Sequence, residues 1–314
     1  MLSGLHAQPM KVFSASGIDK IIEILRDNVA NFIQQNYEGS FELSELPNSN
    51  GKFQASSSSD IVVSNKNIKK LTDGRFIWTN VDGCFDCSGC YKLVSLEGSP
   101  KVAGDYKCGG CKEITTLEGA PDIVKNDFTC NECSLLKSLK GAPQTVGGTF
   151  DCSTNFGIGS LEGMPQKVDS VICSYTFIRT LEGAPDIITG NFDCSCNPML
   201  YTLEGGPERV GKDFICRKCG HLITLEGAPT YVGNNFDCQS CPLLLALYGA
   251  PNYVKNNFDC SSCEELRILK GAPKYVGGNF NCSECKCLTS LDDFEGLPEY
   301  IGKYFSVRYQ NVAG

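Results

Sequence analysis

Residues 236–254 read Phe-Asp-Cys-Gln-Ser-Cys-Pro-Leu-Leu-Leu-Ala-Leu-Tyr-Gly-Ala-Pro-Asn-Tyr-Val, and this stretch decides the fold because the chain repeats it. With small changes it recurs from about Phe85 almost to the end of the 314 residues. A repeat of this length predicts a solenoid or a propeller. The first cysteines of the copies follow one another at intervals of 21 or 22 residues and are Cys87, Cys108, Cys130, Cys152, Cys173, Cys194, Cys216, Cys238, Cys260 and Cys282.

Within one copy, the apolar residues predict a short strand followed by a turn. Phe236 and Cys238 alternate with Asp237, so the first two point to one face of a strand and the aspartate to the other. Two leucines then lead into Gly-x-Pro, where glycine permits a positive φ and proline prevents a helix from continuing. Val254 lies in the connection to the next copy. One coil cannot bury its apolar face alone, so the copies are expected to stack around one continuous core.

The pattern Phe-x-Cys-x-x-Cys-x-x-Leu-x-x-Leu resembles a leucine-rich repeat, in which the second cysteine occupies the ladder position. In three copies that position is Asn155, Thr176 or Asn197, residue types that hydrogen-bond backbone groups at turns. Ser-Leu-Glu-Gly-Met-Pro at 160–165 is similar to leucine-rich-like repeats encoded by large bacteriophages and giant viruses. The resemblance covers about residues 84–301. It implies a leucine-rich-repeat-like solenoid of mostly short parallel β-strands with turns, and a viral protein of the host cytoplasm or the virion.

The chain divides into an N-terminal cap, residues 1–83, and a solenoid of about ten repeats, residues 84–314. Residues 17–36 have the apolar spacing of an amphipathic helix, with Ser16 as its N-cap. We expect its apolar face to cover the open first coil, because solenoid ends need caps. That face consists of Ile18, Ile21, Ile22, Leu25, Val29, Phe32 and Ile33.

The repeat is degenerate at both ends of the solenoid. Residues 61–71 are interpreted as a degenerate first coil. Trp78, the single tryptophan, is expected to pack in the core at this junction. At the other end, an insertion near Phe294 lengthens the last turn, and residues 300–307 are expected to form a capping strand.

The composition limits the classes of partner. The net charge of -8 disfavours nucleic acid and anionic membranes, whereas a basic protein partner fits. The first 17 residues lack the apolar run of a signal peptide, and no stretch is long and apolar enough to span a membrane. The sequence therefore predicts a protein of a reducing cytoplasm.

The repeated Cys-x-x-Cys leaves three alternatives open. Structural ladder thiols in the packed interior are favoured, inter-coil disulfides formed on oxidation come second, and zinc half-sites third. Zinc is disfavoured because the spacing fails in three consecutive copies, and no metal or cofactor is predicted. Cys84 and Cys287 lie outside both cysteine columns and are predicted to be exposed, reactive thiols. The seven pairs are Cys87/Cys90, Cys108/Cys111, Cys130/Cys133, Cys216/Cys219, Cys238/Cys241, Cys260/Cys263 and Cys282/Cys285.

Signals for an enzyme are weak, and we expect none. The chain has two histidines, His6 and His221, and lacks Gly-x-Ser-x-Gly, a P-loop and a histidine-rich cluster. A Cys219–His221 dyad is a poor alternative to a solvated surface patch. A row of glutamates, from Glu97 to Glu226, is expected to be a solvated edge.

The exposed strand face remains as the place for function. Its outward residues are mostly acidic, which suits either a soluble strand face or a concave surface for a basic protein segment or for cations. Copies four to seven break the pattern with aromatic residues and arginine, which protein interfaces use as anchors. The candidate binding residues are Asp151, Ile172, Tyr175, Phe177, Asp193, Ile215, Arg217, Asp237 and Asp259.

The predicted function is a non-enzymatic scaffold that binds a protein partner through the strand face, such as a viral protein that engages a host factor. Two alternatives from other classes stay open. One is a structural virion component that self-associates through its caps, and the other is a Cys-x-x-Cys zinc-binding array.

Overall fold

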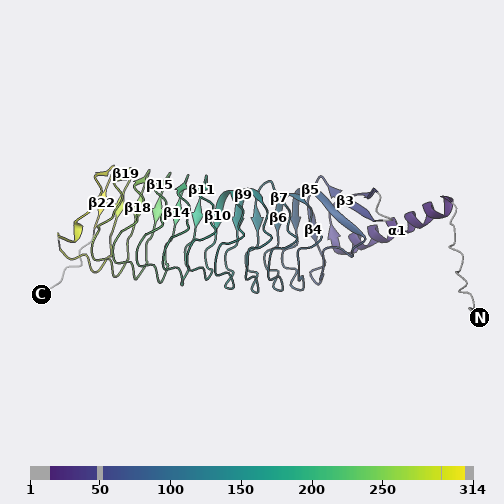
Figure 1. The fold of residues 1–314 in the computed structure, drawn as a ribbon, viewed down its shortest axis with the longest axis horizontal. Helices are drawn as coiled ribbons and strands as arrows, with labels where there is room; N and C mark the ends of the chain where they lie inside the picture. The colour runs from purple at the N-terminus through teal and green to yellow at the C-terminus, as the bar shows by residue number, and fades with distance from the viewer. Residues whose placement is uncertain (1–14, 48–51, 291, 308–314) are drawn as a thin grey trace, which may run out of the picture.

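A computed structural model describes residues 15–47, 52–290 and 292–307. The chain winds into stacked coils that form one elongated body, with helix α1 (Ala15–Asn36) at the N-terminal end (Figure 1). Successive coils pair through parallel strands, which confirms the predicted repeat solenoid with an N-terminal helix. We name each coil by its first cysteine.

The Phe-x-Cys step forms the first strand column, as predicted. Each strand pairs in parallel with the next coil, with equivalent residues opposite each other, such as Phe214 and Phe236. This register follows from the constant repeat length, because a slip by one residue would turn the buried phenylalanines outward. The column contains β5 (Phe76–Asp86), β6 (Val102–Lys107), β8 (Phe128–Thr129), β9 (Thr145–Asp151), β10 (Lys167–Ile172), β12 (Phe192–Asp193), β14 (Phe214–Ile215), β16 (Phe236–Asp237), β18 (Phe258–Asp259), β20 (Phe280–Asn281) and β22 (Phe305–Ser306).

A second strand column occupies the segment that was expected to be a connection. Val254 lies in a strand there, and its neighbour Tyr253 stacks on Tyr275 with ring centroids 4.7 Å apart. Paired strands lie about 4.8 Å apart, and here they occur on two sides of each coil. Successive coils are therefore equally spaced on both sides, so the stack does not curve. The row of coils in Figure 1 is straight, and the expected concave surface is absent from it. The second column contains β7 (Ile123–Val124), β11 (Ile187–Ile188), β13 (Arg209–Val210), β15 (Tyr231–Val232), β17 (Tyr253–Val254), β19 (Tyr275–Val276) and β21 (Tyr300–Ile301).

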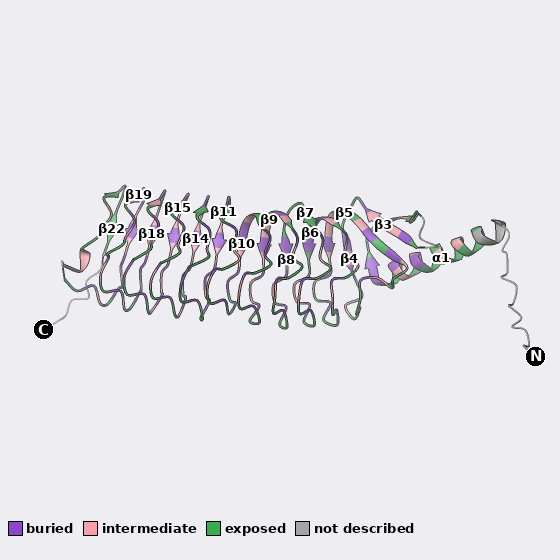
Figure 2. Cartoon of the chain, in the orientation of Figure 1, coloured by how far each residue is buried: buried purple, intermediate pink, exposed green. Residues whose placement is uncertain are grey.

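The core runs along the whole solenoid as columns of like residues (Figure 2). The phenylalanines stack nearly parallel, with centroids 5.3 Å apart for Phe214 and Phe236 and 5.1 Å apart for Phe236 and Phe258. Both cysteine columns and both leucine columns are buried with them, apart from Leu291, which lies outside the described residues. Each coil therefore completes the core of its neighbours, as the repeat predicted.

Helix α1 covers the end of the core most closely with its C-terminal part. Val29 and Ile33 are buried, whereas Ile21 is 42 % exposed. In Figure 1 the N-terminal half of the helix extends beyond the strands. The prediction that the whole apolar face covers the first coil is therefore wrong for Ile21, whereas Ile22 and Leu25 are partly buried and pack against the core. Ser16 lies within the helix and is not its N-cap, and the side chain of Ile18 is outside the described residues.

Short strands join this helix to the solenoid. β1 (Tyr37–Glu38) pairs antiparallel with β4 (Ile61–Val63), and β2 (Glu42–Glu45) pairs antiparallel with β3 (Phe53–Ser57). β4 then pairs in parallel with β5, so a first coil does begin at Ile61. The predicted domain boundary at residue 83 falls inside β5. Trp78 is buried as predicted, with its ring 5.5 Å from that of Tyr37.

The last coil differs from the single capping strand predicted at 300–307. A short 3-10 helix, η1 (Asp292–Phe294), occupies the insertion. After it, Tyr300–Ile301 joins the second strand column and Phe305–Ser306 joins the first. The predicted strand is two strands because the chain must turn between two sides of the coil. Phe305 is 36 % exposed, although equivalent phenylalanines in the interior are buried.

Candidate protein-binding site

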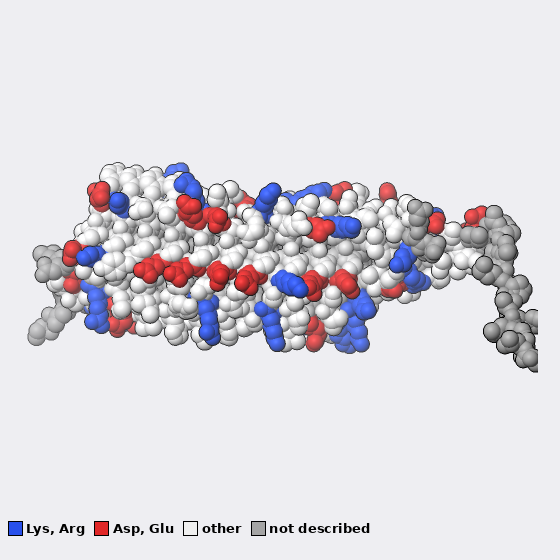
Figure 3. Space-filling view, viewed as in Figure 1, with Lys and Arg blue, Asp and Glu red and all other residues white. Residues whose placement is uncertain are grey.

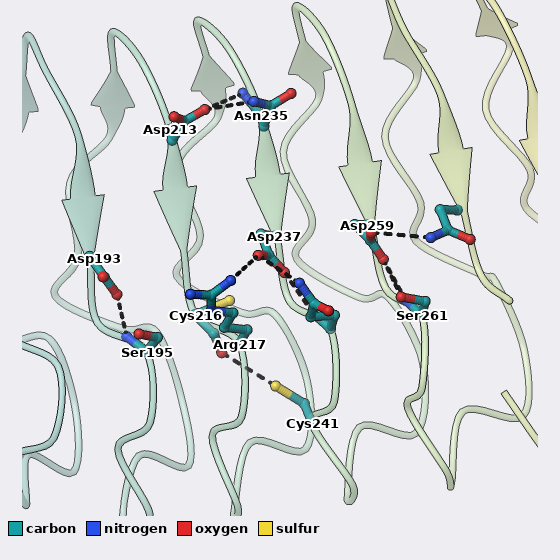
Figure 4. A network of polar contacts seen from close by, with 12 residues as sticks. Asp193, Ser195, Asp213, Cys216, Arg217, Asn235, Asp237, Cys241, Asp259 and Ser261 are labelled. Atoms are coloured by element: carbon teal, nitrogen blue, oxygen red, sulfur yellow. Dashed lines mark hydrogen bonds and ion pairs between the residues drawn. The ribbon is translucent and has the colours of Figure 1, made fainter. Parts of the chain in front are cut away.

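The second cysteine column holds adjacent coils together through thiol hydrogen bonds. In each case the S–H group donates to the carbonyl oxygen of the first cysteine in the preceding coil, as Cys241 does to Cys216 (Figure 4). The sulfur–oxygen distances run from 3.1 to 3.4 Å. These bonds give each of these buried carbonyl groups a donor from the next coil. The donors are Cys111, Cys133, Cys219, Cys241, Cys263 and Cys285.

In the three copies with Asn155, Thr176 or Asn197 at this position, side-chain oxygen and nitrogen atoms form these hydrogen bonds instead of a thiol. The amide of Asn197 donates to the carbonyl oxygens of Cys173 and Cys194 at 3.0 and 2.9 Å. Its Oδ1 accepts from the backbone N–H and the hydroxyl of Thr176, both at 2.7 Å. Asn155 links its own coil to the preceding one in the same way. The ladder position predicted for the second cysteine is therefore confirmed by geometry.

Burial favours the protonated form of these thiols, except that the hydrogen bond with Cys87 lowers the pKa of Cys111. Burial raises the pKa of Cys133 to about 12 and that of Cys285 to about 11, and it raises the pKa of Cys238 well above its usual value. Thiolate in this apolar column would be costly without a compensating charge. All twenty cysteines are free thiols. Within residues 15–47, 52–290 and 292–307, no group of three or more His, Cys, Asp or Glu side chains is placed to hold a metal ion.

The two cysteines predicted to be exposed are only partly so. Cys84 and Cys287 are half-buried, and Cys196 is a third cysteine of this kind. Burial raises the pKa of Cys84 to about 11. Its thiolate fraction at neutral pH is therefore lower than that of a free cysteine, which reduces its reactivity.

Six of the nine predicted binding residues lie in one row on the first strand column. They occupy equivalent positions in neighbouring coils, and each is half-buried. A row of acidic side chains runs along the face shown in Figure 3. The register thus brings together residues up to 108 positions apart in the 314-residue sequence. The row, called the strand-face row below, consists of Asp151, Ile172, Asp193, Ile215, Asp237 and Asp259.

The aspartates of this row also have a structural role that sequence reasoning missed. Oδ1 of Asp193 accepts the backbone N–H of Ser195 at 2.9 Å, and Asp259 does the same for Ser261 (Figure 4). An aspartate that caps the residue two positions on is an Asx turn. The sequence does contain the signal, since a polar residue two positions before each turn recurs in most copies. One carboxylate oxygen is thus engaged in the turn.

Asp237 has the most constrained carboxylate in the row. It accepts hydrogen bonds from the backbone and side chain of Gln239 at 3.1 and 3.0 Å, and its Oδ2 lies 3.7 Å from Nη1 of Arg217. Burial raises its pKa, and the neighbouring carboxylate of Asp259 raises it further, whereas Arg217 lowers it. Arg217 therefore lies beside the row (Figure 4).

The remaining two predicted residues lie outside the strand-face row, in and just after the turn that follows the strand. Tyr175 is 51 % exposed and sits in the turn after the strand, with a φ of 54°. Phe177 follows on the next side of the coil and packs against Phe156, with ring centroids 5.6 Å apart. The structure therefore divides the nine residues between the strand face and the adjacent turn.

A second ladder, at the residue before each strand, was not predicted. The backbone N–H of Asn235 donates to Oδ1 of Asp213 at 3.0 Å, and that of Asn257 donates to Oδ1 of Asn235 at 3.1 Å (Figure 4). At the C-terminal end, this ladder and the strand-face row line a hollow of about 680 Å³ with Tyr304 at its edge. The recurring Asn or Asp before phenylalanine was the available signal.

Comparison of the chain with protein-family models, with curated proteins and with solved structures finds no match. Among the described residues, no helix combines the length and the apolar character needed to cross a membrane.

Proposed function

We propose that this chain is a non-enzymatic scaffold that binds a protein partner through the strand-face row and the adjoining turn. The observation that carries the proposal is the row itself, which alternates carboxylates with Ile172 and Ile215 at the spacing of the coils. Interfaces combine apolar contacts with charged groups that select the partner.

A basic partner suits this row best. Asp151, Asp193 and Asp259 each engage Oδ1 in an Asx turn. In Asp151 and Asp193 no hydrogen bond or ion pair with the described residues engages the second oxygen, which leaves it for a lysine or arginine of a partner. Like charges in neighbouring strands repel, so a bound cation also relieves that repulsion. Tyr175 and Arg217 supply the aromatic and guanidinium groups that often anchor interfaces.

The proposal includes the biological context in which the protein acts. The likeness of the repeat to leucine-rich-like repeats of large bacteriophages and giant viruses supports a viral protein that meets a host factor in the host cytoplasm. A structural component that self-associates end to end is the second candidate. It is supported by the exposed Tyr304 and Phe305 at one end and by Ile21 and Ile24 at the other.

The test neutralises the row without disturbing its turns. In the variant Asp193→Asn/Asp237→Asn/Asp259→Asn, Oδ1 can still accept the turn N–H, as Asn281 does for Ser283 at 3.1 Å. We expect this variant to bind its main partner at least about tenfold more weakly, a loss of about 1.4 kcal/mol. The measurement is quantitative proximity labelling in the native host, followed by the affinity of the most enriched protein at two salt concentrations.

The matched control removes three charges elsewhere, as Asp122→Asn/Asp186→Asn/Glu208→Gln, and is expected to retain the partner. A second variant, Ile172→Asp/Tyr175→Asp, tests the apolar part of the same surface. If both strand-face variants keep every partner of the unmodified chain, the proposal is wrong. If copies of this chain alone are enriched, end-to-end association is the function instead.

A further inference from the structure

A strip of exposed apolar side chains runs along the turn side of the solenoid, and it shares only Phe177 with the predicted strand-face binding residues. The strip lies between the second cysteine and the second leucine of each coil, and its members are 41 to 50 % exposed. Coils stack in register here, because the N–H of Leu245 donates to the carbonyl of Ile223 at 3.1 Å. The apolar strip consists of Phe177, Met199, Tyr201, Ile223, Leu243 and Leu245.

The fold does not require apolar residues at these positions. In the coil of Cys108 the equivalents of Leu243 and Leu245 are Glu113 and Thr115, and in the coil of Cys260 they are Glu265 and Arg267. Those coils have the same core and the same turns. An exposed apolar patch that the fold can do without marks an interaction site, since soluble monomers rarely expose a contiguous one.

Two hollows beside the strip indicate which side chains of a partner it can bind. Arg179, Met199, Tyr201 and His221 line one of about 250 Å³. The other, of about 310 Å³, is lined by Thr180, Glu182, Glu204 and Gly205. The same two coils line both hollows, since Arg179 and Glu182 belong to one coil and Tyr201 and Glu204 to the next. An apolar side chain fits the first hollow, and a cation fits the second.

The carboxylates beside the strip are available to a partner. In the same row, Glu118 is paired with Lys140 at 2.8 Å. Glu182, Glu204 and Glu226 are exposed, and no ion pair reaches them from the described residues. Successive coils are about 4.8 Å apart, so one ammonium or guanidinium group placed between Glu182 and Glu204 contacts both. The carboxylates of Glu182 and Glu204 therefore complement a positive charge on a partner.

We propose that the apolar strip and the glutamates beside it form a second binding surface, which takes a peptide segment of another protein. The segment carries apolar side chains next to lysine or arginine. Its apolar residues cover Met199 and Tyr201, and its cation lies between Glu182 and Glu204. The surface is separate from the strand-face row, so the scaffold can hold two partners at once.

The experiment selects short random peptides, displayed on phage, on the folded protein. The unmodified chain is expected to enrich peptides in which leucine, isoleucine or an aromatic residue adjoins lysine or arginine. The variant Glu182→Lys/Glu204→Lys is expected to enrich aspartate or glutamate in place of the basic residues, because charge reversal inverts selectivity. Met199→Asp/Tyr201→Asp is expected to lose the enrichment.

The controls separate this surface from the strand-face site. Glu97→Lys/Glu118→Lys changes the same row beside the polar residues Glu113 and Thr115, and it is expected to select the same peptides as the unmodified chain. The strand-face asparagine variant is also expected to select them. The residues substituted on the strip side are exposed and those of the strand-face variant are half-buried, and thermal unfolding verifies that each variant folds. The proposal is overturned if no peptide class is enriched, if charge reversal leaves the selected charges unchanged, or if light scattering shows a second copy covering the strip.

Discussion

Raising the pH from about 8 to about 10 is expected to unfold this protein cooperatively. Seventeen of its twenty cysteines are buried. An unfolded thiol ionises near pH 8.5, whereas burial raises the pKa of thiols in the folded chain, to about 12 for Cys133 and about 11 for Cys285. Above pH 8.5 the unfolded state loses protons that the folded state keeps. The stability is therefore fully present below that pH and falls as the pH rises.

The number of thiols makes this effect large. Each thiol that ionises only on unfolding lowers the free energy of unfolding by about 1.4 kcal/mol per pH unit. About eight such thiols would remove about 11 kcal/mol per pH unit, which is comparable to the whole stability of a typical protein. Lysine and tyrosine ionise near pH 10 or above, so the interval from about 8.5 to 10 isolates the cysteines.

Urea titrations at several pH values, under reducing conditions, measure the slope. A matched variant, Cys241→Asn/Cys263→Asn, replaces two ladder thiols with the residue that the chain itself uses at 155 and 197. Its slope is expected to be smaller by about 2.8 kcal/mol per pH unit, twice the single-thiol value. A free energy of unfolding that is constant up to pH 10 would contradict the account of buried, protonated thiols.

Asn197→Leu is expected to lower the free energy of unfolding by about 2 to 4 kcal/mol. The substitution keeps the volume but removes every hydrogen bond of a fully buried side chain. The backbone N–H of Thr176 loses its partner, and the carbonyls of Cys173 and Cys194 each lose one of two donors. Each buried polar group left without a partner costs about 1 to 3 kcal/mol. Urea unfolding at pH 7 measures the loss.

The control for this substitution is Asn197→Cys. A thiol at this position can donate to the carbonyl of Cys173, as Cys219 does to that of Cys194 at 3.4 Å. The cysteine variant is therefore expected to lose less than half as much stability as the leucine variant. Equal losses would mean that the hydrogen bonds of the ladder contribute little and that the asparagine acts through its shape.

The repeat made the architecture predictable from sequence, because a constant period forces equivalent residues into register. Phe236 and Cys238 could be placed inside and Asp237 outside from their alternation alone. The ladder role of the second cysteine could be inferred from Asn155 and Asn197, since asparagine in a buried turn needs backbone partners. These are properties that every coil shares.

Features that depend on one side of the coil were harder to predict. The second strand column contains only two residues per coil, such as Tyr253 and Val254, which is too short for an alternation to be recognised. That column removes the expected curvature. The apolar strip has no fixed residue type, since Met199, His221 and Leu243 occupy equivalent positions. Helix α1 has a continuous apolar face, but the end of the core is wide enough for only part of it.

Raman spectroscopy of the S–H stretching band tests the central claim most directly, because it reports protonated thiols and their hydrogen bonds in the folded protein. The protein is measured as purified at about pH 9, above the usual thiol pKa. The account predicts a strong S–H band shifted by hydrogen bonding. Unfolding and refolding in heavy water should exchange the thiol hydrogens for deuterium and move this band. The variant Cys241→Asn/Cys263→Asn should lose intensity in the shifted part of the band. A missing S–H band, with disulfide or metal–thiolate bands in its place, would contradict it.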